Sequence, residues 1–171
     1  LLIVLFCSSC ENKIDEVQKI SKKYKNEPIQ ITKDAEIIIS DSGCPVIKII
    51  APLIKTYVGI NNYTEFLNHV KVIFYDSLYR TKSYMEANYG IIKNDESKVE
   101  VRNNVVVVNE KGEKLNTEHL IWEQKKEIIT SDVFVKITTK EEVMYGDGLE
   151  ADQYFDKWEI KKPKGIISVK K

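Results

Sequence analysis

A run of four valines, Val105 to Val108, is the feature that most restricts what this chain can fold into. β-Branched side chains stiffen the backbone and favour an extended strand. The next six residues, 109–114, are polar and include Gly112, which can adopt a positive φ in a turn. Residues 115–122 then return as a second apolar stretch. We therefore predict an antiparallel hairpin over residues 101–122.

Similar hairpins are predicted at three further places, over residues 37–51, 72–89 and 133–149. Each returning strand has a small residue near the same place, and these residues are separated by 36, 30 and 29 positions: Ala51, Ala87, Thr117 and Gly146. One hairpin per about thirty residues indicates a stacked or wound β-architecture. An ordinary meander of strands would produce the same spacing. Apart from a possible short helix over 14–24, the pattern predicts an all-β protein.

Three local patterns give more detailed predictions. Pro52 cannot donate to a strand ladder, so the strand over 46–54 should be at an edge or end there. Residues 57–69 are predicted to be irregular, with Phe66 and Leu67 closing one end of the domain. Pro163-Lys164-Gly165 predicts a turn that separates a strand over 158–160 from a terminal strand over 166–169.

Composition and motifs exclude several classes of function. The chain of 171 residues is long enough for one domain with a tail. Its 26 basic and 26 acidic residues are interspersed, so the basic stripe of a nucleic-acid-binding protein is missing. His69 and His119 have no Cys or carboxylate at metal-ligand spacing, and Gly146-Asp147-Gly148 is read as backbone geometry rather than a phosphate loop. The sequence therefore indicates a protein that is not an enzyme and needs no metal or cofactor.

The first ten residues differ from the rest of the chain. Residues 1–6 are apolar, and Cys7-Ser8-Ser9-Cys10 follows. This pattern predicts a truncated lipoprotein signal that ends at Cys10, the candidate lipidated residue; the end of a transmembrane anchor is the alternative. Residues 11–30 are then a tether, and residues 31–171 form the β-domain. With Cys10 acylated, Cys44 would have no partner, so no disulfide is predicted.

A series of short segments, taken in order, resembles the LptC family of lipopolysaccharide export. The segments are 41–43, 51–53, 104–115, 117–122 and 146–150, and the resemblance covers about residues 31–169. It implies a twisted, open β-jellyroll in the periplasm, with a lipopolysaccharide-binding interior. It also implies LptA, LptF and LptG as partners, with LptB as the ATPase behind them. The N-terminus departs from the family pattern of a transmembrane helix, and a lipid on Cys10 would anchor the domain at the inner membrane instead.

Alternate residues of each strand should face the interior of such a fold. Eight residues share this period-two parity within their strands and are the predicted inner face: Ile47, Ile49, Val72, Phe74, Val105, Val107, Val133 and Val135. Each sheltered methylene of a lipid contributes about 0.8 kcal/mol, so ten contribute roughly 8 kcal/mol. The same residue types would line a lipid slot or fill a closed core, and the family resemblance implies the slot.

These observations predict a non-enzymatic carrier that passes lipopolysaccharide from the inner-membrane ABC transporter to the next jellyroll of a bridge. A structural or adaptor lipoprotein with a filled β-core and no lipid cargo is the alternative. A carbohydrate-binding β-sandwich is a third possibility and would require exposed aromatic residues clustered on one face. The short apolar segment Ile166-Ile167-Ser168-Val169 is predicted to extend the sheet of an LptA-like jellyroll by strand addition.

Overall fold

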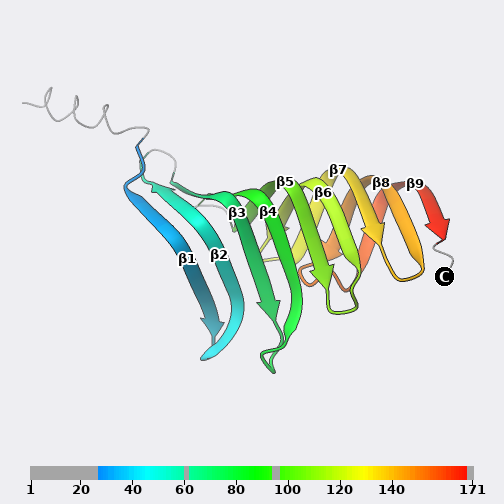
Figure 1. Ribbon diagram of the computed structural model, residues 1–171, viewed down its shortest axis with the longest axis horizontal. Helices are drawn as coiled ribbons and strands as arrows, with labels where there is room; N and C mark the ends of the chain where they lie inside the picture. The colour runs from blue at the N-terminus through cyan, green and yellow to red at the C-terminus, as the bar shows by residue number, and fades with distance from the viewer. Residues whose placement is uncertain (1–26, 60–61, 94–96, 169–171) are drawn as a thin grey trace, which may run out of the picture.

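The computed structural model describes residues 27–59, 62–93 and 97–168, and these form one antiparallel sheet of nine strands (Figure 1). The strands follow one another in chain order: β1 (Gln30–Asp41), β2 (Cys44–Tyr57), β3 (Tyr63–Tyr75), β4 (Thr81–Lys93), β5 (Lys98–Asn109), β6 (Lys114–Glu123), β7 (Ile128–Thr138), β8 (Glu142–Asp152) and β9 (Trp158–Ser168). The all-β class and the predicted hairpins are confirmed. Over these residues the structure contains no helix that could span a membrane. The predicted signal and lipidation site at Cys10 lie outside the described residues.

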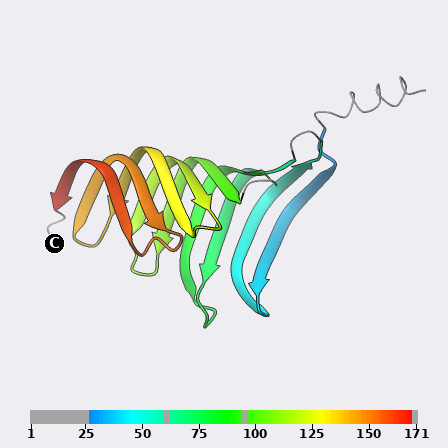
Figure 2. The same ribbon diagram turned by 180° about the vertical axis from the view of Figure 1, so that it is seen from behind.

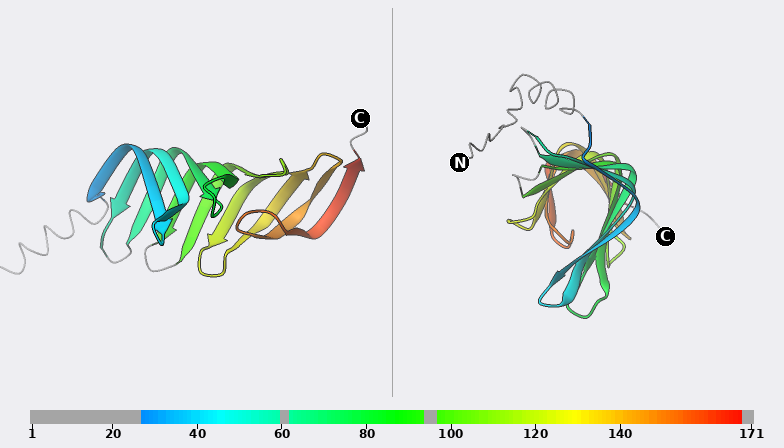
Figure 3. Two further views of the ribbon diagram at one scale, coloured as in Figure 1. Left: turned by 90° about the horizontal axis from the view of Figure 1, so that it is seen from below. Right: turned by 90° about the vertical axis from the view of Figure 1, so that its left-hand side faces the viewer.

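Irregularities in register bend the sheet along a line near the middle of its strands. Unpaired residues fall between Ile50 and Leu53 on β2 and between Arg102 and Val105 on β5, and β3, β4, β6 and β7 have similar shifts. A bulge bends its strand and increases the local twist. The strands therefore fold over, and the view along the sheet shows a trough with an open side (Figure 3).

The two halves of the bent sheet face each other across the trough. The rings of Phe74 on β3 and Trp122 on β6 meet edge to face with centroids 5.1 Å apart, although these strands are not neighbours in the sheet. Ala51 and Ala87, two of the regularly spaced small residues, are each 1% exposed and lie beside the bends. The spacing seen in the sequence therefore marks the positions where the strands turn over.

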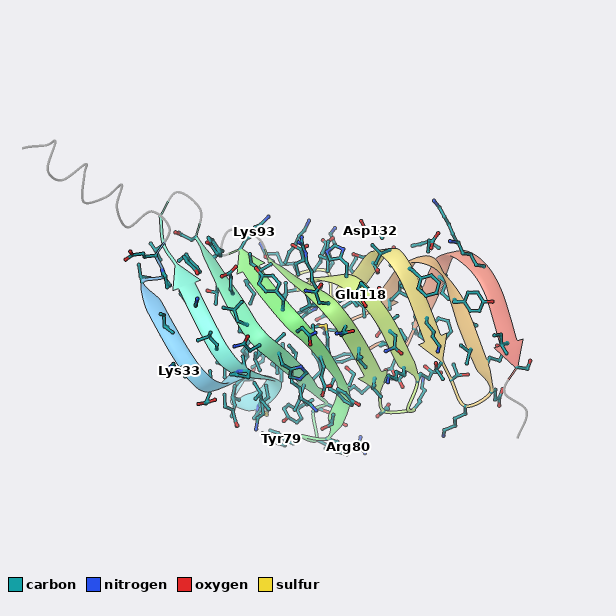
Figure 4. All side chains as sticks on the ribbon, turned by 45° about the horizontal axis from the view of Figure 1, so that its top comes forward. Lys33, Tyr79, Arg80, Lys93, Glu118 and Asp132 are labelled. Carbon is teal, nitrogen blue, oxygen red and sulfur yellow. The ribbon has the colours of Figure 1, made fainter. Side chains whose placement is uncertain are left out.

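The trough has two rims, each made of turns between strands. The first rim contains the β3–β4, β5–β6 and β7–β8 turns, at residues 76–80, 110–113 and 139–141. The second rim contains the β6–β7 and β8–β9 turns, at residues 124–127 and 153–157. Figure 4 labels Arg80 at the first rim and Lys93, at the opposite end of β4, toward the second. The view from behind shows the later strands passing from rim to rim (Figure 2).

Three local predictions were wrong. Residues 63–69 belong to strand β3, and Phe66 is a core residue at 4% exposure rather than an end plug. Pro52 lies in an interior strand, because β2 pairs with both β1 and β3. It is tolerated there because it falls in the gap between the paired residues Ile50 and Leu53, where no ladder hydrogen bond is required.

The predicted turn at 163–165 is instead part of the continuous strand β9. Pro163 is accommodated because β9 is the last strand of the described sheet, so one of its edges has no strand to pair with. Gly165 lies under the ring of Tyr145, and a Cβ atom there would be 2.5 Å from the phenol oxygen. The Pro-Gly pair therefore serves an edge strand and an aromatic contact, not a reversal of the chain.

Candidate functional site

The inner face of the trough is a continuous apolar surface built from alternate residues of neighbouring strands. Six of the eight residues predicted for it are buried in the core: Ile49, Val72, Phe74, Val105, Val107 and Val135. Ile47 is half-buried and packs against this core. The fold therefore brings seven of the predicted residues together on one surface.

Val133 differs from the other predicted inner-face residues. It is half-buried and lines an open pocket together with Asn116 and the exposed Phe134. The register of β7 against β8 shifts between Ser131 and Phe134, so an extra residue lies on β7 at this point. A bulge interrupts the alternation of side chains between the two faces of the sheet. Counting every second residue along the sequence assumes that the alternation is regular, so it does not detect the bulge.

Several inner-face residues were not among the predicted ones. Among those that are 3% exposed or less are Met85, Val101, Leu115, Leu120, Trp122 and Phe155. Alternation in the sequence could have identified Met85 and Leu120, since both lie within predicted strands. Phe155 lies in the β8–β9 turn, where no periodic pattern exists, and it is nevertheless fully buried at 0% exposure.

The interior of the trough is packed. The apolar cavity between its halves, lined by Ile49, Val72, Val101 and Trp122 among others, has a volume of about 40 Å³. A cavity of that volume has room for a few water molecules. A lipid chain could occupy this interior only if the two halves of the sheet moved apart or side chains turned away.

Both edges of the sheet expose apolar side chains. On β9, Ile166 is 63% and Ile167 is 57% exposed, and Ser168 is exposed as well. Val169, the fourth residue of the predicted partner strand, lies outside the described residues. On β1 at the other edge, Ile31 and Ile38 are each 55% exposed. Within the described sheet β1 pairs only with β2 and β9 only with β8, so each edge strand has one row of backbone groups without a strand partner.

A polar network covers the bend of β5, β6 and β7, and Figure 4 labels one of its members, Asp132. His119 places Nε2 2.7 Å from Glu100 Oε1 and Nδ1 3.0 Å from Asp132 Oδ1, and Arg102 donates to the same Glu100 carboxylate. Partial burial raises the pKa of Glu100, but hydrogen bonds from Arg102 and His119 outweigh it, and the pKa falls below its usual value. The hydrogen bond from His119 likewise lowers the pKa of Asp132. Over the described residues, no group of His, Cys, Asp and Glu side chains could hold a metal ion.

We expect Glu100→Gln to lower the free energy of unfolding by about 1 kcal/mol at pH 7, because the substitution removes a charge-assisted hydrogen-bond acceptor. Because the pKa of Glu100 is lower in the folded state than in the unfolded state, its ionised carboxylate stabilises the fold at pH values above the unfolded-state pKa. This stabilisation is lost as the pH falls through the folded-state pKa. The difference between Glu100→Gln and the unaltered protein should therefore shrink toward zero below about pH 4. Urea denaturation of the two proteins at pH 7 and at about pH 3.5 measures the difference in their free energy of unfolding at each pH. An equal difference at the two pH values would contradict the expectation.

Comparison with known families agrees with this architecture. The chain matches the family model described as lipopolysaccharide-assembly, LptC-related, over residues 1–163. The comparison with curated protein sequences gave no match. The family match covers most of the chain, and the open antiparallel sheet is consistent with the jellyroll expected of that family. This protein therefore belongs to the LptC family, which takes part in lipopolysaccharide transport.

Proposed function

We propose that the domain binds lipopolysaccharide along the inner face of its trough and passes it to the next jellyroll of a periplasmic bridge. The observation that carries this proposal is the continuous apolar inner face, which runs from Ile49 on β2 to Leu149 on β8. Alternate side chains of consecutive strands form it, so it could shelter an acyl chain along the length of the sheet. The domain acts without catalysis.

The open sheet provides a physical route for admitting a lipid. Within the described residues β1 and β9 do not pair with each other, so the sheet is not a closed barrel. The halves of the trough contact each other through side chains such as Phe74 and Trp122. Separating these side chains exposes apolar surface, and an incoming acyl chain covers that surface again at about 0.8 kcal/mol per methylene. Lipid binding would therefore replace contacts within the core rather than fill a preformed channel.

The packed interior also favours the alternative function, a structural or adaptor lipoprotein without lipid cargo. A cavity of about 40 Å³ is far too small for an acyl chain in the conformation described. A filled core is what such an adaptor would require. The two functions differ in whether lipid can be captured from the interior.

The remaining parts of the proposal concern anchoring and partners. Acylation of Cys10 would hold the domain on the periplasmic side of the inner membrane, beside LptF and LptG of the LptB-driven transporter. The β9 edge, with Ile166 and Ile167 exposed, would pair with an LptA-like jellyroll. The family membership and the exposed edge support these assignments.

We expect a photo-crosslinking residue at Val107, or at the half-buried Ile47, to capture lipopolysaccharide in cells, because both side chains belong to the inner surface. The same residue at Glu110 or Lys114 should capture little, since both positions are exposed at the first rim. Immunoblots of irradiated cells with antibodies against lipopolysaccharide and the protein measure the capture. Lack of capture at both inner positions, or equal capture at all four, would favour the adaptor.

A further inference from the structure

The β8–β9 turn crosses the open side of the trough. It starts at the second rim, where the Gln153 N–H donates to the Glu127 carbonyl oxygen of the β6–β7 turn at 2.8 Å, and its ribbon runs from there toward the first rim (Figure 3). Residues 155–158 make their contacts on the first rim. The Asn109 side-chain amide donates to the Phe155 carbonyl oxygen at 2.8 Å, and the Trp158 indole donates to Glu113 Oε2 at 3.2 Å. Asn109 is the last residue of β5 and Glu113 is the last residue of the β5–β6 turn, so both belong to the first rim. We call residues 152–158 the rim latch.

Charged side chains strengthen this connection between the rims. Asp156 of the rim latch lies 3.0 Å from the Lys82 ammonium and 3.8 Å from that of Lys111, both on the first-rim side. Glu110 also pairs with Lys82, and the hydrogen bonds that the Lys82 ammonium donates to Glu110 and Asp156 raise the pKa of Lys82 above its usual range. Lys82 therefore stays charged at any physiological pH, and the connection between the rims has an ionic component beside its hydrogen bonds.

Aromatic side chains of the rim latch fill the interior beneath it. Phe155 is 0% exposed and stacks on Trp158, with ring centroids 6.0 Å apart. Tyr154 meets Phe74 of β3 edge to face at 6.2 Å. These rings occupy apolar space between the two rims, so an acyl chain could enter this end of the trough from the side only if they moved out.

The rim latch can leave the first rim without losing its own fold. The Asp152 carboxylate accepts the backbone N–H groups of Tyr154, Asp156 and Lys157 at 2.9–3.0 Å, and these bonds lie within the turn. Phe155 has a φ of 59°, a left-handed conformation that is uncommon for a bulky side chain and that belongs to the fold of the turn itself. The buried Asp156 Oδ1 atom accepts no hydrogen bond from the described residues and is held only by the longer 3.8 Å contact with the Lys111 ammonium.

We propose that the rim latch is a gate, which closes the open side of the trough and swings away as a unit when an acyl chain enters. This inference rests on the proposed lipid-carrying function for its biological purpose. The opening itself is a property of the protein alone and can be measured without lipid. The two parts can therefore fail separately.

Ser83 provides a probe of the opening. It is 1% exposed and pairs across the sheet with Phe74 and Asn109, the first-rim partners of Tyr154 and Phe155. We expect Ser83→Cys in the full chain to react with a thiol reagent about tenfold faster than Ala87→Cys, which is equally buried but lies near the bend of β4. Peptide mass spectrometry separates these sites from the natural cysteines, and each rate is normalised to the same variant in denaturant. Equal normalised rates would mean that only global unfolding exposes residue 83, and would overturn the gate.

An isosteric substitution tests what holds the rim latch closed. Added to each labelling variant, Asp156→Asn removes the ionic contacts with Lys82 and Lys111. It should raise the labelling rate at position 83 about fivefold and leave the rate at position 87 unchanged. The matched control is Asp147→Asn, which removes the 2.7 Å pair between β8 and Lys164 of β9 and should change neither rate. Equal acceleration at both positions by Asp156→Asn would indicate general destabilisation and would overturn the proposal.

The lipid part is tested with the Val107 crosslinker in cells. We expect Asp156→Asn to increase capture of lipopolysaccharide about fivefold, in parallel with the labelling rate at position 83. Unchanged capture despite faster labelling would show that the rim latch opens but does not control lipid access, and would overturn the gate. Capture that is absent in both proteins would contradict the lipid-carrying function itself, while the labelling ratio would still decide whether the rim latch opens.

Discussion

Gly146→Ala is expected to lower the free energy of unfolding by about 4 kcal/mol or more, a large part of the stability of a domain this size. A Cβ atom at position 146 would lie 2.2 Å from the Lys162 carbonyl oxygen and 2.6 Å from Ile160 Cγ2. The backbone of β9 cannot move aside locally as a flexible side chain can, so β9 as a whole would have to move away from β8 at the bend. Urea denaturation followed by circular dichroism measures the change.

Gly59→Ala is the matched control for that substitution. A Cβ atom at position 59 meets nothing within 4 Å. We therefore expect a change of less than about 0.5 kcal/mol, as for most surface substitutions. If Gly146→Ala unfolded at the same urea concentration as Gly59→Ala, the close approach of β8 and β9 would not be essential to the fold.

Ile167→Pro is expected to reduce binding of an LptA-like jellyroll at least about tenfold and to leave the domain folded. Ile167 is 57% exposed on the last described strand, so little core packing depends on it. Proline removes one backbone donor and places its ring against an incoming strand, which interrupts pairing along an edge. A pull-down with the partner jellyroll measures binding, and circular dichroism verifies the fold.

The opposite edge supplies the control. Ile31 on β1 is an exposed isoleucine on the other edge strand, at 55%. Ile31→Pro should leave binding of the same partner unchanged, because the partner is proposed to dock on β9. Loss of binding with Ile31→Pro but not with a folded Ile167→Pro would move the docking surface to β1.

The amino-acid sequence alone was sufficient to predict the hairpins and most of the inner face. The valine run at 105–108 and the polar turn after it correctly predict the β5–β6 hairpin, because strands and tight turns depend on residues that are neighbours in the sequence. Seven of the eight predicted inner-face residues meet in the trough because side chains alternate along every strand. The spaced small residues also lie at the bends, although their role emerged only when the strands were paired.

Only the tertiary structure decided which residues depart from these local rules. Pro52 is tolerated inside the sheet, and Val133 leaves the core, because bulges arise from the pairing of two strands and not from either sequence alone. Phe155 lies in a turn without periodicity, and its burial depends on Asn109, 46 residues away in the chain. The packed interior is likewise a property of facing half-sheets, since the same valines and isoleucines would suit a hollow slot or a filled core. Local residue types predict strands, whereas the contacts between distant strands decide what the trough holds and how it is closed.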